Sequence, residues 1–234
     1  MRFHRAIRQG LILTGALALV GCQENEPPSE PPAQRSADHA FILDGVVITR
    51  AAIDDYTDWM KSLDPTLGRD KRTREVLEHL IPLAFARHEF GKQRAGLRNR
   101  ATSIAERLGA SASYEELENQ VGLLAETEVR TGVVRQELPL PEQRWLFEDL
   151  NLGRVSTVIE TAQGFSLVAA TDKQFGITKA YDRVDAILVR FYFQNTKEYH
   201  DWYAALKTRL AELPKDGIFI HADFRDATPY WLEY

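Results

Sequence analysis

The stretch Phe41–Trp59, FILDGVVITRAAIDDYTDW, contains an apolar segment, a turn signal and the start of a helix. Asp44-Gly45 interrupts the apolar run and predicts a short strand that is broken by a turn. Thr49 has a side chain preferred at a helix N-cap, and the apolar residues after it recur at helical spacing. The stretch therefore predicts a short strand that leads directly into a helix.

Three further helices are predicted before the proline-rich stretch Leu138–Pro141 ends the helical region. The first of them runs from about residue 69 to 90. The next ends near Gly109, because glycine is typical just after a helix. The last begins at Ser113–Glu116, which has the sequence of a capping box, and its apolar stripe continues toward Val129.

The rest of the chain combines strands with one long helix. A short helix at Trp145–Leu150 precedes two predicted strands, Gly153–Thr161 and Gly164–Thr171. From Arg183 to Leu213 the apolar residues keep a period near 3.6, which predicts one long helix. Ile218–Phe224 predicts a closing strand. The expected fold class is α+β, mainly α-helical.

The composition excludes several classes of protein. The chain has 234 residues, of which 44% are apolar and 27% charged, so it can bury a core and is not disordered throughout. A net charge of −5 argues against a nucleic-acid partner. The single cysteine excludes an internal disulfide and a multi-cysteine metal site. The six histidines lack the spacing of a metal motif, so we expect no metal and no cofactor.

The N-terminus, MRFHRAIRQGLILTGALALVGC, has the order of parts found in a bacterial lipoprotein signal. Three arginines precede the apolar run Leu11–Val20, which is too short to span a bilayer. The run ends in a sequence that resembles a lipobox, whose cysteine receives a diacylglycerol and becomes the mature N-terminus. We therefore expect residues 1–21 to be a signal peptide and Cys22 to carry the lipid anchor.

Residues 22–40 are rich in proline, glutamate and serine and have no apolar periodicity, so they predict a semi-extended tether. Gln23 follows the lipidated cysteine, where an aspartate would usually retain a Gram-negative lipoprotein in the inner membrane. The expected location is thus the bacterial cell envelope, on the periplasmic face of the outer membrane.

The order of these elements resembles the SurA-like and PrsA-like periplasmic foldases. The residues that carry the resemblance are ITRAAIDDYTDW (48–59), the apolar helix that follows, and IFIHADF (218–224) after the predicted long helix. The resemblance implies a helical N-terminal chaperone domain onto which a C-terminal helix and strand pack. The closing strand would then pair near Val46.

The stretch Gly153–Val168, GRVSTVIETAQGFSLV, resembles the last third of a parvulin-type prolyl isomerase domain. The matching residues are Gly153, Val155, Ser156, Ile159, Thr161, Gly164, Phe165, Leu167 and Val168. Val158 stands where proline is common, and Ser166 stands where the family has an active-site histidine. The first part of a parvulin module has no counterpart between Arg135 and Trp145. We therefore expect a truncated parvulin remnant without catalytic residues.

The resemblance divides the chain after the tether into three parts: an N-terminal helical domain (41–137), the parvulin-like remnant (138–176) and a C-terminal helix and strand (177–234). Aromatic residues concentrate in the last part, and aromatic side chains offer large, sequence-tolerant contact areas. The candidate peptide-binding residues are Tyr192, Phe193, Trp202, Tyr230 and Trp231. The arginines between Lys92 and Arg107, Arg94 among them, are interpreted as a solvated helix face.

The leading functional hypothesis is a membrane-anchored chaperone that binds unfolded or partly folded exported polypeptides without turnover. Its cleft would lie between the N-terminal helices and the long C-terminal helix. Two alternatives remain: an accessory lipoprotein that binds one folded partner in an envelope secretion or export system, and an active peptidyl-prolyl cis-trans isomerase. The departure at Ser166 disfavours the enzyme.

Overall fold

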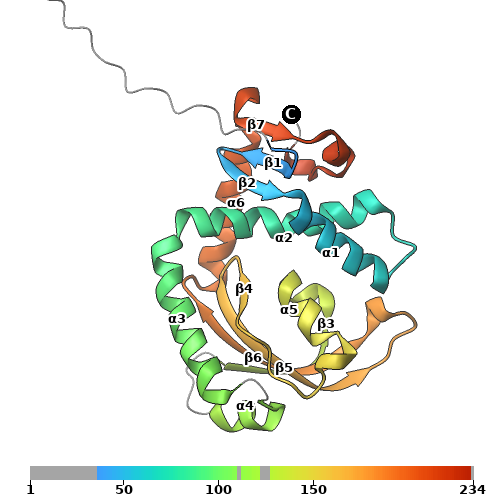
Figure 1. Ribbon diagram of the computed structural model, residues 1–234, viewed down its shortest axis with the longest axis vertical. Helices are drawn as coiled ribbons and strands as arrows, with labels where there is room; N and C mark the ends of the chain where they lie inside the picture. The colour runs from blue at the N-terminus through green and yellow to red at the C-terminus, as the bar shows by residue number, and fades with distance from the viewer. Residues whose placement is uncertain (1–35, 110–111, 122–126, 233–234) are drawn as a thin grey trace, which may run out of the picture. The chain divides into compact units, whose positions relative to one another are not determined.

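The structure is a computed structural model that describes residues 36–109, 112–121 and 127–232 (Figure 1). The predicted signal peptide (1–21), the lipidation site Cys22 and the tether before residue 36 lie outside the described residues. Residues 35–234 form one compact unit. It contains two antiparallel sheets together with helices, so the α+β class is confirmed. Among the helices that the structure describes, none has both the length and the apolar character needed to cross a bilayer.

The first sheet contains the predicted strand and turn as a β-hairpin. β1 (His39–Leu43) and β2 (Val46–Thr49) pair across Asp44 and Gly45, whose φ angles are +50° and +77°. These two positive φ angles suit the tight hairpin turns in which Asp-Gly is favoured. Thr49 ends the hairpin and caps the next helix, because its Oγ1 accepts the N–H of Ala52 at 3.3 Å.

The third strand of this sheet comes from the end of the chain. β7 (Ile218–Ile220) pairs antiparallel with β1, so that Ile218 lies opposite Leu43 and Ile220 opposite Phe41. The strand order is β2-β1-β7. The predicted closing strand Ile218–Phe224 is thus present only over Ile218–Ile220, since a 3-10 helix begins at Ala222, and the prediction that it pairs near Val46 is wrong. β1 is buried from Ala40 to Leu43 and needs a partner on each side, whereas β2 alternates buried and exposed residues like an edge strand.

Four helices follow the hairpin, close to the predicted positions: α1 (Arg50–Leu63), α2 (Arg69–Glu89), α3 (Gly91–Leu108) and α4 (Tyr114–Val121). Gly109 follows α3 with a φ of +84°, which glycine adopts without strain. The predicted capping box precedes α4: the Ser113 N–H donates to Glu116 Oε2 at 2.7 Å, and the Glu116 N–H donates to Ser113 Oγ at 3.2 Å.

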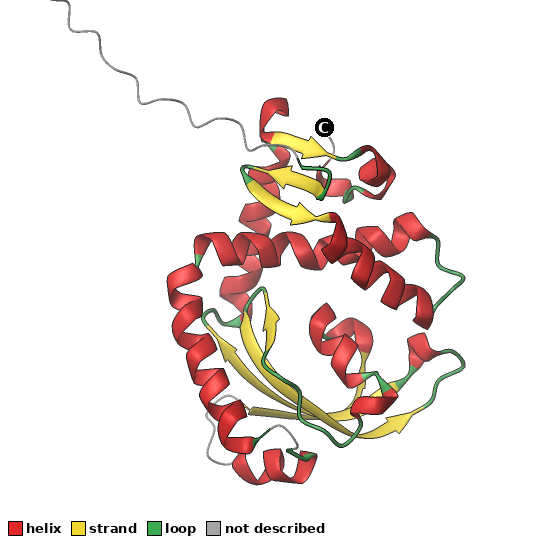
Figure 2. Cartoon of the chain, in the orientation of Figure 1, coloured by secondary structure: helices red, strands yellow, loops and turns green. Residues whose placement is uncertain are grey.

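The second sheet has four antiparallel strands in the order β3-β6-β5-β4 (Figure 2). They are β3 (Thr127–Val134), β4 (Ile159–Thr161), β5 (Gly164–Gln174) and β6 (Arg183–Tyr192). β5 contains the predicted strand Gly164–Thr171, but only Ile159–Thr161 of the predicted strand Gly153–Thr161 is in β4. Because β3 and β6 come from outside the range 138–176, the sheet extends across the boundaries of the predicted parvulin remnant.

The predicted long helix Arg183–Leu213 is wrong in its first third. That segment is β6, and only α6 (Thr196–Ala211) is helical, starting at a capping box between Asn195 and Glu198. β6 buries residues on both faces of its sheet, so its centre, Ala186–Val189, is an apolar run without a visible period of two. The helical stripe predicted toward Val129 fails similarly, because Val129 lies in β3.

A short helix lies where the sequence predicts the end of the helical region. α5 (Leu140–Leu146) begins inside Leu138–Pro141. The predicted helix Trp145–Leu150 therefore overlaps only the end of α5, and a 3-10 turn follows at Asp149–Asn151. Proline is tolerated in the first turn of a helix, since the N–H that it lacks would have no partner there.

Three apolar clusters hold these elements together. The first joins the hairpin, α1, α2, α6 and the C-terminal residues, including Phe41, Phe85 and Phe224. The second fills the space between α5 and one face of the four-stranded sheet, and the third joins the opposite face to α3 and α4. In Figure 1, α5 accordingly lies on the side of the sheet that faces α1 and α2.

The packing of Phe224 gives a direct test of the closing segment. Its side chain is 1% exposed, and its ring centroid lies 6.1 Å from that of Phe41 on β1. Phe224→Ala should lower the free energy of unfolding by about 3–5 kcal/mol, because the substitution leaves a cavity beside the hairpin. Urea denaturation measures this change. Phe175→Ala is the matched control: Phe175 is 78% exposed, so a change within about 0.5 kcal/mol is expected.

Candidate functional site

A cleft lies between the helices that follow the hairpin and the elements of the second sheet. It consists of two adjoining hollows of about 280 and 510 Å³. Both are lined by Tyr56 of α1, Leu80 and Leu83 of α2, and Pro141 of α5, so they form one continuous depression. Volumes of this size, with mainly apolar walls, are typical of ligand sites.

The wall opposite α2 is the proline-rich stretch. Leu138, Pro139, Leu140 and Pro141 all line the smaller hollow. Proline has a fixed φ and no N–H, so this wall presents apolar surface on a backbone with little freedom. The side chains of Leu138 and Leu140 are themselves buried, Leu138 in the cluster on the four-stranded sheet and Leu140 in the cluster of α1 and α2, so the wall is held from both sides.

Two histidines lie at the rim of the smaller hollow, His79 of α2 and His200 of α6. Burial lowers the pKa of His79, and the nearby Glu78 opposes this only in part. His79 is therefore neutral at pH 7 and adds no charge to the wall. The two histidines are not part of a metal site: the described residues contain no group of three His, Cys, Asp or Glu side chains placed to hold an ion.

The β4–β5 turn at the mouth of the cleft is held by two arginines. Arg94 of α3 is 3% exposed and donates to Glu160 Oε1 at 2.7 Å and to the carbonyl oxygens of Thr161 and Ala162 at 2.8 and 3.0 Å. Arg87 of α2 donates to the other oxygen of Glu160 at 2.6 Å. The interpretation of Arg94 as part of a solvated face is therefore wrong, because it binds backbone carbonyls that a sequence pattern does not show.

Gly164 completes this turn. Its φ is +153°, and a Cβ at this position would lie 2.1 Å from the carbonyl oxygen of Phe191 on β6. Only glycine lets β5 approach β6 this closely at the turn. The arginines and Gly164 together fix Ala162 and Gln163 at the cleft, where both line the smaller hollow.

The five aromatic residues predicted to bind peptide lie in separate places, and none belongs to the cleft wall as the structure describes it. Phe193 and Trp202 both contact Phe90: their ring centroids lie 4.7 and 5.6 Å, respectively, from that of Phe90. The Trp202 Nε1 donates to Glu89 at 2.8 Å. Both side chains are half-buried and serve the packing of α6 on α2.

The other three candidates also have partners. The Trp231 Nε1 donates to Glu78 at 2.6 Å, and the Tyr192 hydroxyl donates to the buried Glu142 at 3.4 Å. Tyr230 is 72% exposed, with the guanidinium of Arg74 4.2 Å from its ring centroid. Sequence reasoning missed the actual cleft residues. The signal for them was the proline-rich stretch, whose alternating leucines and prolines were interpreted only as a helix end.

The parvulin-like stretch contains no catalytic arrangement. Ser166, at the position of the family's active-site histidine, is fully buried, and its Oγ has no hydrogen-bond partner among the described residues. Ser156 is bonded to β5, the strand that contains Ser166. Its N–H donates to the Val168 carbonyl at 2.8 Å, and its Oγ accepts the Val168 N–H at 2.9 Å. The matching serine thus joins the loop before β4 to β5.

No protein-family model, no curated protein and no solved structure matches this chain.

The Glu160 cluster predicts a dependence of stability on pH. Burial raises the pKa of Glu160, but hydrogen bonds and charge from Arg87 and Arg94 lower it by more, so the pKa lies below its usual value. The stabilisation is therefore present above the unfolded-state pKa of about 4.3 and is lost as pH falls through the lower folded-state pKa. Glu160→Gln should cost about 2 kcal/mol at pH 7. The difference should persist to about pH 5 and shrink below pH 4 in urea titrations.

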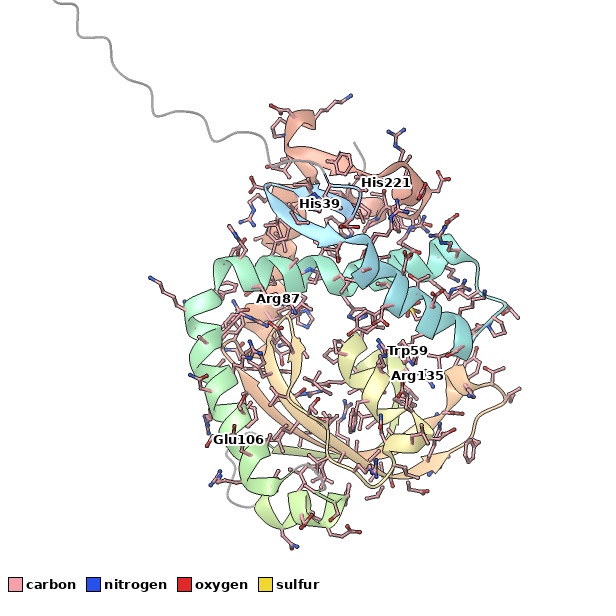
Figure 3. All side chains as sticks on the ribbon, in the orientation of Figure 1. His39, Trp59, Arg87, Glu106, Arg135 and His221 are labelled. Carbon is pink, nitrogen blue, oxygen red and sulfur yellow. The ribbon has the colours of Figure 1, made fainter. Side chains whose placement is uncertain are left out.

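Glu106→Gln is the matched control for this measurement. Glu106 is exposed on α3 (Figure 3) and has no ion pair within the described ranges. It should change the unfolding free energy by less than about 0.5 kcal/mol. If the effect of Glu160→Gln is as large at pH 3 as at pH 7, the ionised cluster is not its cause.

Proposed function

We propose that the chain is a SurA/PrsA-like chaperone of the bacterial envelope that binds extended, apolar segments of exported polypeptides without turnover. The observation that carries the proposal is the cleft between α1, α2 and the α5–β4 side of the second sheet. Its walls are mainly apolar, and one of them contains two prolines, whose backbone has little freedom.

The arrangement of the chain ends supports the same proposal. In the foldase family, the C-terminal helix and strand pack on the N-terminal domain. Here β7 pairs with β1, and the side chains of α6 and the C-terminal residues join the apolar cluster of α1 and α2. The helical part expected to resemble a foldase N-terminal domain is thus completed by residues from the other end of the chain.

An extended polypeptide fits this cleft for physical reasons. Leucine and tyrosine side chains offer apolar contact without requiring a particular ligand sequence. The charged groups near the mouth are already paired, since Glu160 binds Arg87 and Arg94, and Arg144 binds Asp55. The cleft therefore presents little unpaired charge to a ligand, and burial of apolar surface provides its affinity.

The anchoring belongs to the same proposal. A lipid on Cys22 and a tether over residues 22–40 would place the cleft at the periplasmic face of the outer membrane, where exported polypeptides pass in an unfolded state. Binding of exposed apolar segments at that stage would suppress their aggregation.

A cleft-filling variant tests the proposal. The full chain at stoichiometric amounts should suppress the aggregation of a denatured outer-membrane protein, followed by light scattering. Ala162→Trp places a large ring at the mouth of the cleft and should reduce suppression at least five-fold. Ala205→Trp, on the exposed side of α6, is the control and should leave suppression unchanged.

Two outcomes would contradict this prediction. Absence of suppression by the wild-type chain would exclude the chaperone function. Capture of one folded envelope protein in a stoichiometric complex, without any unfolded client, would favour the accessory lipoprotein instead.

The enzyme alternative has its own test. Prolyl isomerisation has a barrier of about 18–20 kcal/mol, and lowering it requires a formed pocket around the proline. The residue at the histidine position of the parvulin family, Ser166, is buried away from the cleft. The isomerisation of a proline tetrapeptide should therefore proceed at its uncatalysed rate with the full chain present. Efficient turnover, checked against an active prolyl isomerase under the same conditions, would overturn this prediction.

A further inference from the structure

Arg135 is a buried cation without a hydrogen-bonding partner. It begins the 3-10 turn Arg135–Glu137 after β3 and is 4% exposed. All three guanidinium nitrogens are buried, and none has a hydrogen bond within the part of the chain that the structure describes. Arg94 is equally buried at 3%, yet both of its terminal nitrogens donate to carbonyl or carboxylate oxygens. Among the described residues, the buried Arg72 and Arg94 both donate to backbone carbonyls, whereas the buried Arg135 has no hydrogen bond.

The surroundings of Arg135 explain its position but not its missing partners. Its guanidinium carbon lies 4.6 Å from the ring centroid of Phe147 and 5.8 Å from that of Trp59, which Figure 3 labels beside it. Aromatic rings interact with a guanidinium through its face and leave its N–H groups unsatisfied. Asp182 and Asp149 act on the guanidinium through their charge, but neither forms a hydrogen bond with it, and both form ion pairs with Lys173.

An unpaired buried charge is costly, and the group remains charged. Burial lowers the pKa of Arg135 to about 10, with Asp182 and Asp149 opposing the shift, so the guanidinium is protonated at pH 7. Proteins normally pair such a group with a carboxylate or expose it to water. A ligand that supplies the missing anion would offset the free-energy cost of burying this guanidinium.

A cavity adjoins this arginine. It has a volume of about 190 Å³, and Arg135 forms part of its wall. Its apolar lining comes mainly from the end of α1 and the loop after it: Met60, Leu63 and Leu67. Gln136 lines both this cavity and the smaller hollow of the cleft, so both spaces border the turn that carries Arg135.

We propose that this cavity binds the C-terminal residue of a polypeptide held in the cleft, with the terminal carboxylate paired to Arg135 and the last side chain against Met60, Leu63 and Leu67. This inference rests on the proposed function, because the rest of the polypeptide lies in the cleft. A guanidinium matches a carboxylate in a planar, two-point geometry. Asp64 and Glu75 also line the cavity and disfavour a doubly charged anion such as phosphate.

Access to the guanidinium involves the turn between β5 and β6. Ala180 and Tyr181 of this turn line the cavity, and Tyr181 is 68% exposed. The guanidinium nitrogens lie behind the cavity wall, so carboxylate binding displaces part of it. None of residues 179–181 is buried or belongs to an apolar cluster, so this turn is the exposed side of that wall.

The test compares two peptides that differ only at the C-terminus. A dye-labelled peptide of about ten apolar and small residues is prepared as the free acid and as the amide, and its binding to the full chain is measured by fluorescence anisotropy. The wild-type chain should bind the acid at least ten-fold more tightly than the amide. Arg135→Met should bind both with the affinity that the wild-type chain has for the amide, whereas the exposed control Arg107→Met should keep the ten-fold difference.

Thermal unfolding separates ligand binding from a structural role. Arg135→Met removes an unpaired charge, so its unfolding midpoint should equal or exceed that of the wild-type chain. Arg94→Met removes a fully bonded arginine and should lower the midpoint. If Arg135→Met lowers the midpoint as much as Arg94→Met does, Arg135 is structural and the proposal is overturned.

The remaining outcomes are distinguishable. Equal binding of the acid and the amide by the wild-type chain overturns the carboxylate site but does not contradict the chaperone function. This comparison uses the wild-type chain alone, so it does not depend on whether a variant folds. Binding of neither peptide contradicts both proposals. If N-acetyl-leucine competes with the acid peptide at an equal concentration, the site binds free carboxylic acids, and the assignment to polypeptide ends is wrong.

Discussion

The pairing of β1 with β7 is the constraint on which the rest of the structure depends. β1 is buried almost along its whole length and lies between the strand that follows it and a strand from the end of the chain. Everything between β2 and β7, including the cleft, belongs to one long connection whose ends meet in this sheet. Closing such a connection costs conformational entropy, and the apolar cluster around Phe41, Phe85 and Phe224 offsets that cost.

The cleft follows from this constraint. The hairpin leads directly into α1, and the apolar cluster fixes α1 and α2 against the C-terminal residues. The second sheet meets these helices partly through α5, whose Leu140 belongs to the same apolar cluster, and partly through Arg87 of α2, which donates to Glu160 of β4. On α3, Arg94 donates to the β4–β5 turn, and Ala101 and Ile104 pack against the sheet. Apolar packing thus positions both walls of the cleft, whereas charge-assisted hydrogen bonds fix the β4–β5 turn, whose position depends more on pH and ionic conditions.

Local interactions made part of this fold predictable. The turn at Asp44-Gly45, the cap at Thr49 and the capping box at Ser113 depend on neighbouring residues, and all three occur as the sequence predicts. β6 was not predictable in this way, because a strand buried on both faces has no alternation to distinguish it from a helix. The candidate site was predicted least well. Aromatic residues draw attention in a sequence, but Trp202 and Trp231 bind glutamates of α2 and pack α6 in place.

The order of the first sheet also affects how the chain acquires its fold during synthesis. The central strand is among the first folded residues to emerge, and its partner β7 is among the last. Until the C-terminal residues arrive, β1 has an open edge and the apolar cluster of the helices lacks Phe224 and α6. Unpaired strand edges are prone to non-native pairing. A chain interrupted before residue 218 would therefore lack both strand β7 and the contacts that close its largest apolar cluster, so complete synthesis is a condition of folding.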